Sequence, residues 1–244
     1  MTYRKLIKGF DAFKSDFFGK EVNADYQKLV EEGQRPETLV IACSDSRIDP
    51  ALLTYSDLGQ FFAVRNVAAL VPPYGEKDNL HGVSAAIEYA VRALGVKHIV
   101  VLGHAGCGGI NALATGNYQV EPNTEFEFIE KWLDIARHAK ERIDAEMPDA
   151  DQAYKISTLE QAAVIVSLHN LLSFPWIKSR CDDNVLKIHG WCFDMQQGEL
   201  YEYQPDRGIF DTVDVTGQDK ALLTAQNGLD FFIKNKACCA GNAA

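Results

Sequence analysis

Residues 98–109, with the sequence HIVVLGHAGCGG, decide the expected fold of this 244-residue chain. The segment from His98 to Leu102 is a short run of mostly β-branched and aliphatic residues, and it ends at Gly103. Short apolar runs of this kind are typical of strands that are buried on both faces of a parallel sheet. We therefore predict a strand here, with the polar residues after Gly103 at its carboxyl end.

Similar runs occur on both sides of this segment. They predict buried strands at Thr38–Cys43, Phe61–Val64 and Val185–Ile188, and Leu200–Tyr203 is a possible edge strand. Before the central strand, a helix is predicted by apolar residues at three- and four-residue steps with a glycine after them: Leu80, Val83, Ile87, Val91 and Leu94, then Gly95. Strand, helix and strand in this order imply right-handed crossovers, and hence an α/β fold with a parallel sheet.

The remaining helices and the domain limits complete the expected organisation. Further helices are predicted at residues 122–147, 151–172 and 217–235. The chain is expected to form one domain over 1–244, with a helical arm at 1–32, a catalytic core at 33–236 and a small-residue tail at 237–244. The arm carries an apolar stripe at helical spacing, formed by Leu6, Phe10, Phe13 and Phe17. This stripe packs either into the core of its own chain, which is the simpler interpretation, or across a partner subunit.

The charge and the cysteine content narrow the class of protein. Acidic residues outnumber basic ones by 34 to 24, and the charges are scattered along the chain. This argues against a surface that binds nucleic acid or an anionic membrane. No run approaches the roughly 20 apolar residues that span a bilayer, and no secretory signal is evident, so we expect a soluble cytoplasmic protein. Its six cysteines are then expected to be reduced thiols, free for metal binding or catalysis.

Two polar clusters follow predicted strands, where open parallel sheets place their ligands. Cys43 ends one strand, and His104 and Cys107 lie in the glycine-rich turn after another. Two cysteines and one histidine form the donor set of a catalytic zinc site whose fourth position stays open. Each residue alone has a simpler explanation, as a small core residue or a turn hydrogen-bonder. Their joint position favours a zinc site made by Cys43, His104 and Cys107.

Asp45 and Arg47 lie beside the first proposed ligand. In extended backbone, residues two apart point the same way, so these two side chains can form a bidentate ion pair. An ordinary surface ion pair is the alternative. Next to a metal ligand, the carboxylate has two further possibilities: it can bind the ion, or it can accept a hydrogen bond from water at the metal.

Three segments together resemble those of the β-class carbonic anhydrases: Cys43-x-Asp45-x-Arg47, Val64-Arg65-Asn66-Val67-Ala68 and Gly103-His104-x-x-Cys107-Gly108-Gly109-Ile110. The resemblance runs from about Gln34 to Asn111, and His189-Gly190-Trp191 agrees further on. It implies a central, mostly parallel sheet of four to five strands flanked by helices. It also implies a homodimer, or a larger oligomer built from dimers, with the active site near the subunit interface.

The same resemblance implies the reaction and the site. The reaction would be the zinc-dependent, reversible hydration of carbon dioxide to bicarbonate, by attack of zinc-bound hydroxide. Zinc (Zn2+) would be held by Cys43, His104 and Cys107, with Asp45 and Arg47 as the catalytic dyad. In the plant-like branch of the family, the positions that match Gln34, Phe62, Val67 and Tyr89 form the substrate pocket. Backbone N–H groups after Cys107, at Gly108, would stabilise the charge that develops on oxygen.

Three other functions are compatible with these residues. A zinc hydrolase on the same scaffold would act on carbonyl sulfide or carbon disulfide, which are also small linear electrophiles. A non-enzymatic protein with a structural zinc would need a fourth protein ligand, which Asp45 offers. A metal-free enzyme would use Cys43 or Cys107 as nucleophile and His104 as base.

One branch of the family is regulated by bicarbonate, and the resemblance bears on that as well. The effector pocket of that branch uses a Trp and a Tyr at positions where this chain has Val40 and Phe193. Neither side chain donates a hydrogen bond, and a buried anion without donors is costly. We therefore expect no effector pocket, with Asp45 paired to Arg47 and the fourth zinc position left to water.

Overall fold

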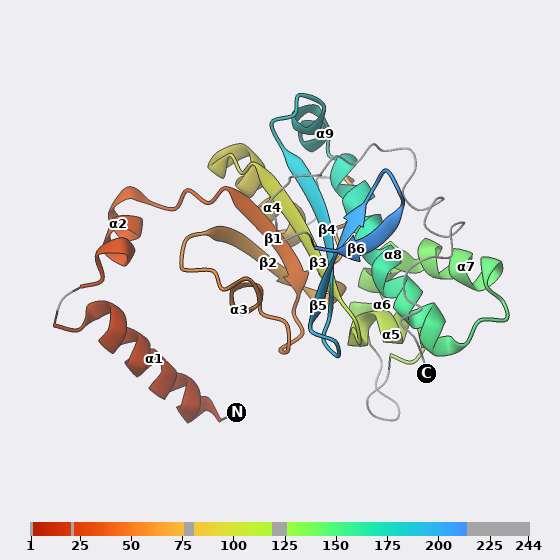
Figure 1. Ribbon diagram of the computed structural model, residues 1–244, viewed down its shortest axis with the longest axis horizontal. Coiled ribbons are helices and arrows are strands. Elements are labelled where there is room, and N and C mark those ends of the chain that lie inside the picture. Colours follow the sequence, from red (N-terminus) through yellow and green to blue (C-terminus); the bar gives the residue numbers. More distant parts are fainter. Residues whose placement is uncertain (1, 21, 76–80, 119–125, 214–244) are drawn as a thin grey trace.

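A computed structural model describes residues 2–20, 22–75, 81–118 and 126–213. Within them, six strands form one sheet in the order β2-β1-β3-β4-β5-β6 (Figure 1). The strands are β1 (Thr38–Cys43), β2 (Phe61–Asn66), β3 (His98–His104), β4 (Lys187–Asp194), β5 (Glu199–Gln204) and β6 (Ile209–Thr212). The first four strands pair in parallel, and β5 and β6 are added antiparallel. The predicted α/β fold with a mostly parallel sheet is confirmed.

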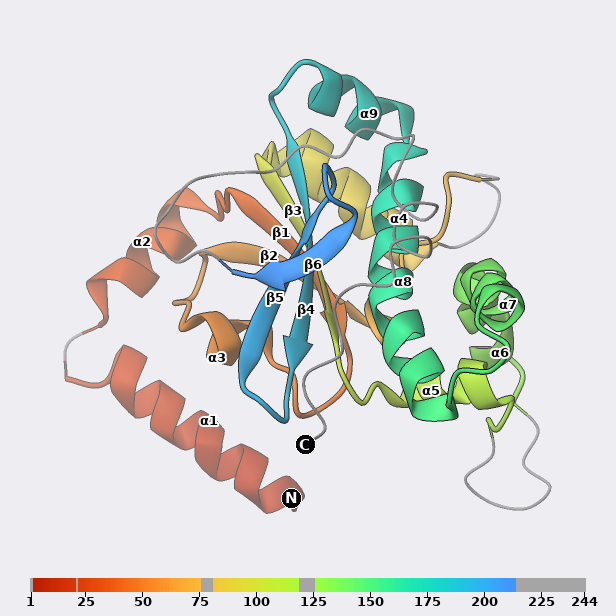
Figure 2. The ribbon, with the colours of Figure 1, turned by 45° about the vertical axis from the view of Figure 1, so that its right-hand side comes forward.

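Helices cover the sheet along one face and around its ends. They are α1 (Tyr3–Phe18), α2 (Ala24–Glu32), α3 (Pro50–Thr54), α4 (Gly82–Glu88), α5 (Gly108–Thr115), α6 (Ile129–Leu133), α7 (Arg137–Glu146), α8 (Gln152–Leu172) and α9 (Pro175–Asp182), with a π-helical turn over Tyr89–Leu94 and 3-10 turns over Val67–Ala69 and Asp134–Ala136. Helix α8 packs directly on β3 and β4, and α7 lies outside it (Figure 2). Helix α8 therefore covers the face of the sheet next to the carboxyl end of β3.

Alternate residues of the central strands enter two separate apolar cores. Leu39 and Ile41 face the core that α8 covers, whereas Val40 and Ala42 face a smaller cluster on the other side. Both faces of β1 are therefore buried, which explains why its sequence is an unbroken apolar run rather than an alternating one. The run ends at Cys43, the carboxyl end of the strand.

Several predicted elements differ from the observed ones. The predicted edge strand at 200–203 is an inner strand, because β6 pairs with its outer side and brings the sheet to six strands. The strand predicted at 185–188 begins two residues later and continues to Asp194. Of the helix predicted over 122–147, residues 122–125 lie outside the described residues. The rest contains two helices, α6 and α7, because a 3-10 turn keeps the buried Leu133, Ala136 and Ala139 on one face at three-residue spacing.

The N-terminal helix does not join the core of its own chain. Both views show α1 standing away from the sheet (Figures 1 and 2). It has no buried residue, and its Leu6 and Phe10 are exposed. Phe13 and Phe17 contact only the aromatic cluster around Tyr26 of α2 among the ring contacts of the described residues. The intramolecular interpretation of the stripe is therefore wrong. The predicted helix at 217–235 and the tail at 237–244 lie outside the described residues.

Candidate metal centre

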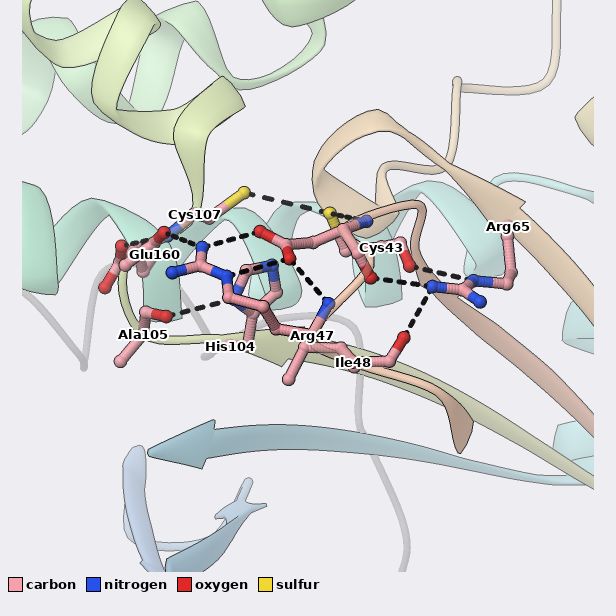
Figure 3. A network of polar contacts seen from close by, with 10 residues as sticks. Cys43, Arg47, Ile48, Arg65, His104, Ala105, Cys107 and Glu160 are labelled. Atoms are coloured by element: carbon pink, nitrogen blue, oxygen red, sulfur yellow. Dashed lines mark hydrogen bonds and ion pairs between the residues drawn. The ribbon is translucent and has the colours of Figure 1, made fainter. Parts of the chain in front are cut away.

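Two neighbouring strands and one turn bring the predicted metal ligands together. Cys43 ends β1, His104 ends the adjacent β3, and Cys107 precedes the first residue of α5. All three are buried, and their donor atoms lie within 4.8 Å of one another, with the two sulfur atoms 4.0 Å apart (Figure 3). Among the described residues, this is the one group of three or more Cys, His, Asp or Glu side chains arranged to hold a metal ion.

The donor atoms of the cluster suit a cation. His104 Nδ1 lies 3.0 Å from the carbonyl oxygen of Ala105, to which an N–H at that atom would donate. His104 Nε2 is buried and has no hydrogen-bond partner among the described residues, so its lone pair is available to a metal. Either sulfur of the Cys43–Cys107 contact can be the donor, and this contact lowers the pKa of Cys43 and raises that of Cys107. The two cysteines and the histidine therefore fit zinc, which takes thiolate and neutral imidazole ligands.

The predicted ion pair lies directly beside these ligands. Arg47 Nε donates to Asp45 Oδ1 at 2.9 Å, and Arg47 Nη2 donates to Asp45 Oδ2 at 2.7 Å. The backbone N–H of Arg47 adds a third bond, to Oδ1 at 2.9 Å. These donors hold the pKa of Asp45 well below its usual range. Arg47 Nη2 also donates to the Gly106 carbonyl, which links the pair to the turn that carries Cys107. The expected bidentate geometry is observed.

Glu160 is a buried carboxylate behind the centre that the sequence analysis missed. It lies on α8, and its Oε1 accepts the Cys107 backbone N–H at 2.9 Å. Burial raises the pKa of Glu160 to about 7. A glutamate in a predicted helix is expected on the solvent face, so its residue type gave no signal. The run of apolar residues from Ala162 to Val166 just after it, which leaves little room for a solvent face, was the available clue.

The residues predicted for the substrate pocket fall into two groups. Val67 and Gly108 lie at the metal end of the sheet, since Val67 follows β2 and packs beside Gly109. Phe62 and Tyr89 form another group, with ring centroids 5.9 Å apart. Phe62 pairs with Leu39 at the start of β1, about 13 Å along the strand from the level of Cys43.

Gln34 lies at the same end as Phe62. It is exposed and precedes the first residue of β1 by four positions. It therefore lies near the amino end of this strand, whereas Cys43 is at the carboxyl end. The geometry of one chain therefore does not bring Gln34, Phe62 and Tyr89 together with the metal ligands.

Comparison with known proteins agrees with this geometry. The family model described as carbonic anhydrase matches residues 38–200. Beta carbonic anhydrase 3 of Arabidopsis thaliana is 39% identical over 200 residues, which cover 81% of this chain and 76% of the plant protein. A carbonic anhydrase of Synechococcus elongatus is 33% identical over 226 residues, covering 90% and 80% of the two chains.

Solved structures show the same relationship. The structure of the β-carbonic anhydrase CcaA has a TM-score of 0.79 and 29% identity, covering 90% of this chain and 94% of that one. A structure from a study of two tetrameric β-carbonic anhydrases of Sordaria macrospora has a TM-score of 0.61 and 28% identity, with coverage of 82% and 92%. The matched residues 38–200 include all three metal ligands and the Asp45–Arg47 pair. The chain belongs to the β-carbonic anhydrase family.

Proposed function

We propose that this chain catalyses the zinc-dependent, reversible hydration of carbon dioxide to bicarbonate, with the metal held by Cys43, His104 and Cys107. The observation that carries the proposal is the buried Cys2His donor set, in which the free Nε2 of His104 faces two sulfur atoms. Asp45 is engaged by Arg47, which favours an open fourth position over a closed structural site. When bound, zinc supplies a Lewis acid that lowers the pKa of a water molecule from about 15.7 to about 7.

Asp45 is placed to orient the attacking oxygen. An ionised carboxylate has about four acceptor positions, and Arg47 occupies two on Oδ1 and one on Oδ2. The remaining position, on Oδ2, can accept a hydrogen bond from the attacking O–H group and so keep the lone pair of that oxygen directed at the substrate carbon. Arg47 keeps this carboxylate ionised and in a single orientation.

The start of α5 provides donors for the charge that develops on the substrate oxygen. The first N–H groups of a helix have no partners within it and carry the positive end of the helix dipole. Those of Gly109 and Ile110 favour the thiolate form of Cys107, because they act to lower its pKa. We assign the N–H of Gly108 to the substrate oxygen, with Val67 as an apolar wall beside it.

A homodimer is part of the proposal, because one chain does not complete the pocket. Gln34, Phe62 and Tyr89 lie about a strand length from the metal ligands of their own chain. A second copy that brings this group to the metal end of the first would complete both pockets. The exposed apolar stripe of α1 supports association of this kind, because a helix without a buried face gains stability from a partner.

The dependence of activity on pH tests this assignment. Arg47 lowers the pKa of Asp45, so Asp45 stays charged at every pH above its unfolded pKa of about 3.9. The stability that this ion pair contributes is lost only as the pH falls from about 3.9 toward the lower pKa of the folded state. Asp45 does not titrate near neutral pH, so we expect the rate of hydration to rise with a single ionisation, that of the water that zinc activates, with a pKa of about 7. Stopped-flow measurements between pH 6 and 9 give the profile, and carbonyl sulfide and carbon disulfide, tested in parallel, should be the poorer substrates.

Bicarbonate provides the second arm of this experiment. Val40 and Phe193 lie in one apolar cluster with Val100 and Leu102, where a buried anion would find no side-chain donor from these residues. Inhibition by bicarbonate should therefore be non-cooperative. A steep, cooperative loss of activity with bicarbonate, or a stronger activity on a sulfur substrate than on carbon dioxide, would contradict the assignment.

A further inference from the structure

Arg65 is an arginine near the end of β2 whose guanidinium turns back toward the metal ligands. In the sheet it pairs with Ala42, one residue before Cys43. Its Nε donates to the Cys43 carbonyl at 3.1 Å, and its Nη2 donates to the carbonyls of Asp45, at 2.8 Å, and Ile48 (Figure 3). Its Nη1 donates to Asp49 Oδ2 at 3.2 Å. One side chain thus binds four acceptors in the short segment from Cys43 to Asp49, which contains the turn over residues 45–48.

This turn carries Asp45. Within it, the Ile48 N–H donates to the Asp45 carbonyl at 3.1 Å, and the Ser44 N–H donates to the Asn66 carbonyl at 2.8 Å. Asp49 caps α3, because its Oδ1 accepts the N–H groups of Ala51 and Leu52. Arg65 therefore connects the end of β1, the middle of the turn and the start of α3.

We infer that Arg65 is a positioning residue for Asp45, an assignment that rests on the proposed function. Arg47 orients the carboxylate itself, whereas Arg65 holds the backbone from which the carboxylate projects. A planar guanidinium suits this task because its N–H groups reach several carbonyls at once, which an ammonium group cannot do in the same geometry. The ion pair with Asp49 is partly exposed and contributes little by comparison.

The test compares Arg65→Gln and Arg65→Lys with two controls. Asp49→Asn removes the ion pair but keeps a residue that caps helices well. Arg92→Gln removes a surface arginine that pairs with Glu88, away from the turn. For each variant we would measure zinc content, kcat and KM for carbon dioxide hydration, and hydrogen exchange of the backbone amides of residues 44–48.

We expect Arg65→Gln to keep its zinc and to hold KM within about twofold, while kcat falls by roughly 10- to 100-fold, as for other residues that support a metal site. Exchange at residues 44–48 should become faster, and exchange in β3 should stay as in the parent. Arg65→Lys should recover part of the lost kcat. Both controls should behave like the parent protein.

Three results would overturn the inference. The first is a parent-like kcat with parent-like exchange in either Arg65 variant. The second is loss of zinc together with faster exchange throughout the sheet, which would show a general structural role. The third is an Asp49→Asn variant as impaired as Arg65→Gln. If Arg65→Gln does not fold, Arg65→Lys carries the same comparison. If the parent protein does not hydrate carbon dioxide, the proposed function fails, whereas the exchange data still show whether Arg65 holds the turn.

Discussion

Replacing Cys43, His104 or Cys107 by alanine, one at a time, will yield a protein without zinc and without measurable hydration of carbon dioxide. Each change removes one of three protein donors from a buried site whose donor atoms lie within 4.8 Å of one another. Two remaining ligands do not hold the ion, and the Lewis acid that activates water is lost with it. We expect activity to fall by ~10³-fold or more, with metal content measured by elemental analysis on the same samples.

The other cysteines provide the matched control. Cys181 and Cys192 are buried cysteines that belong to no metal-binding group of the described residues. Burial raises the pKa of Cys181 to about 11, which keeps it protonated and a poor ligand. A variant that lacks both of them, together with Cys238 and Cys239, should retain one zinc per chain. Zinc retained in all three alanine variants, or lost in this control, would show that the ligand assignment is wrong.

Arg47→Ala will separate metal binding from catalysis. The variant keeps every zinc ligand, so its zinc content should equal that of the parent. Asp45 loses the two side-chain bonds that orient it, from Nε and Nη2, and keeps only the weaker hold of the backbone N–H. The freed carboxylate can then turn toward the cation and occupy the position that water needs. Activity should fall by about 100-fold, because a misplaced group of this kind costs roughly that factor.

Arg47→Lys is the conservative companion of this variant. A lysine keeps the positive charge beside Asp45 but lacks the bidentate fork, so it should restore only part of the activity. Parent-like turnover in Arg47→Ala, measured with full zinc occupancy, would show that the ion pair has a structural role alone.

Much of the fold follows from local sequence patterns. The bounds of β1 were predicted to the residue, because both faces of that strand are buried and its apolar run ends where the chain reaches the metal ligands. The edge of the sheet was harder to predict. Ile209–Thr212 is a short strand whose burial alternates only weakly, and its pairing with β5 depends on a turn rather than on an apolar run.

In the candidate site, too, local sequence patterns predicted some residues, whereas others depend on contacts between distant segments. The ligands and the ion pair were predictable because they stand close together in two short segments. Glu160 and Arg65 were not, because their roles arise from contacts across 53 residues to Cys107 and 22 residues to Cys43. The sequence pattern also did not predict that Phe62 and Gln34 lie near the start of β1, at the end of the sheet away from the metal ligands. A motif gives the order of residues along the chain and does not state which copy of the chain supplies each one.

Zinc content and carbon dioxide hydration, measured on one sample of the unmodified protein, test the proposed function most directly. We expect about one zinc per chain, loss of activity when a chelator removes the metal, and recovery in proportion to the zinc that is added back. Full hydration activity in a preparation without metal would show that the proposed function is wrong, and so would a fully zinc-loaded protein that does not hydrate carbon dioxide.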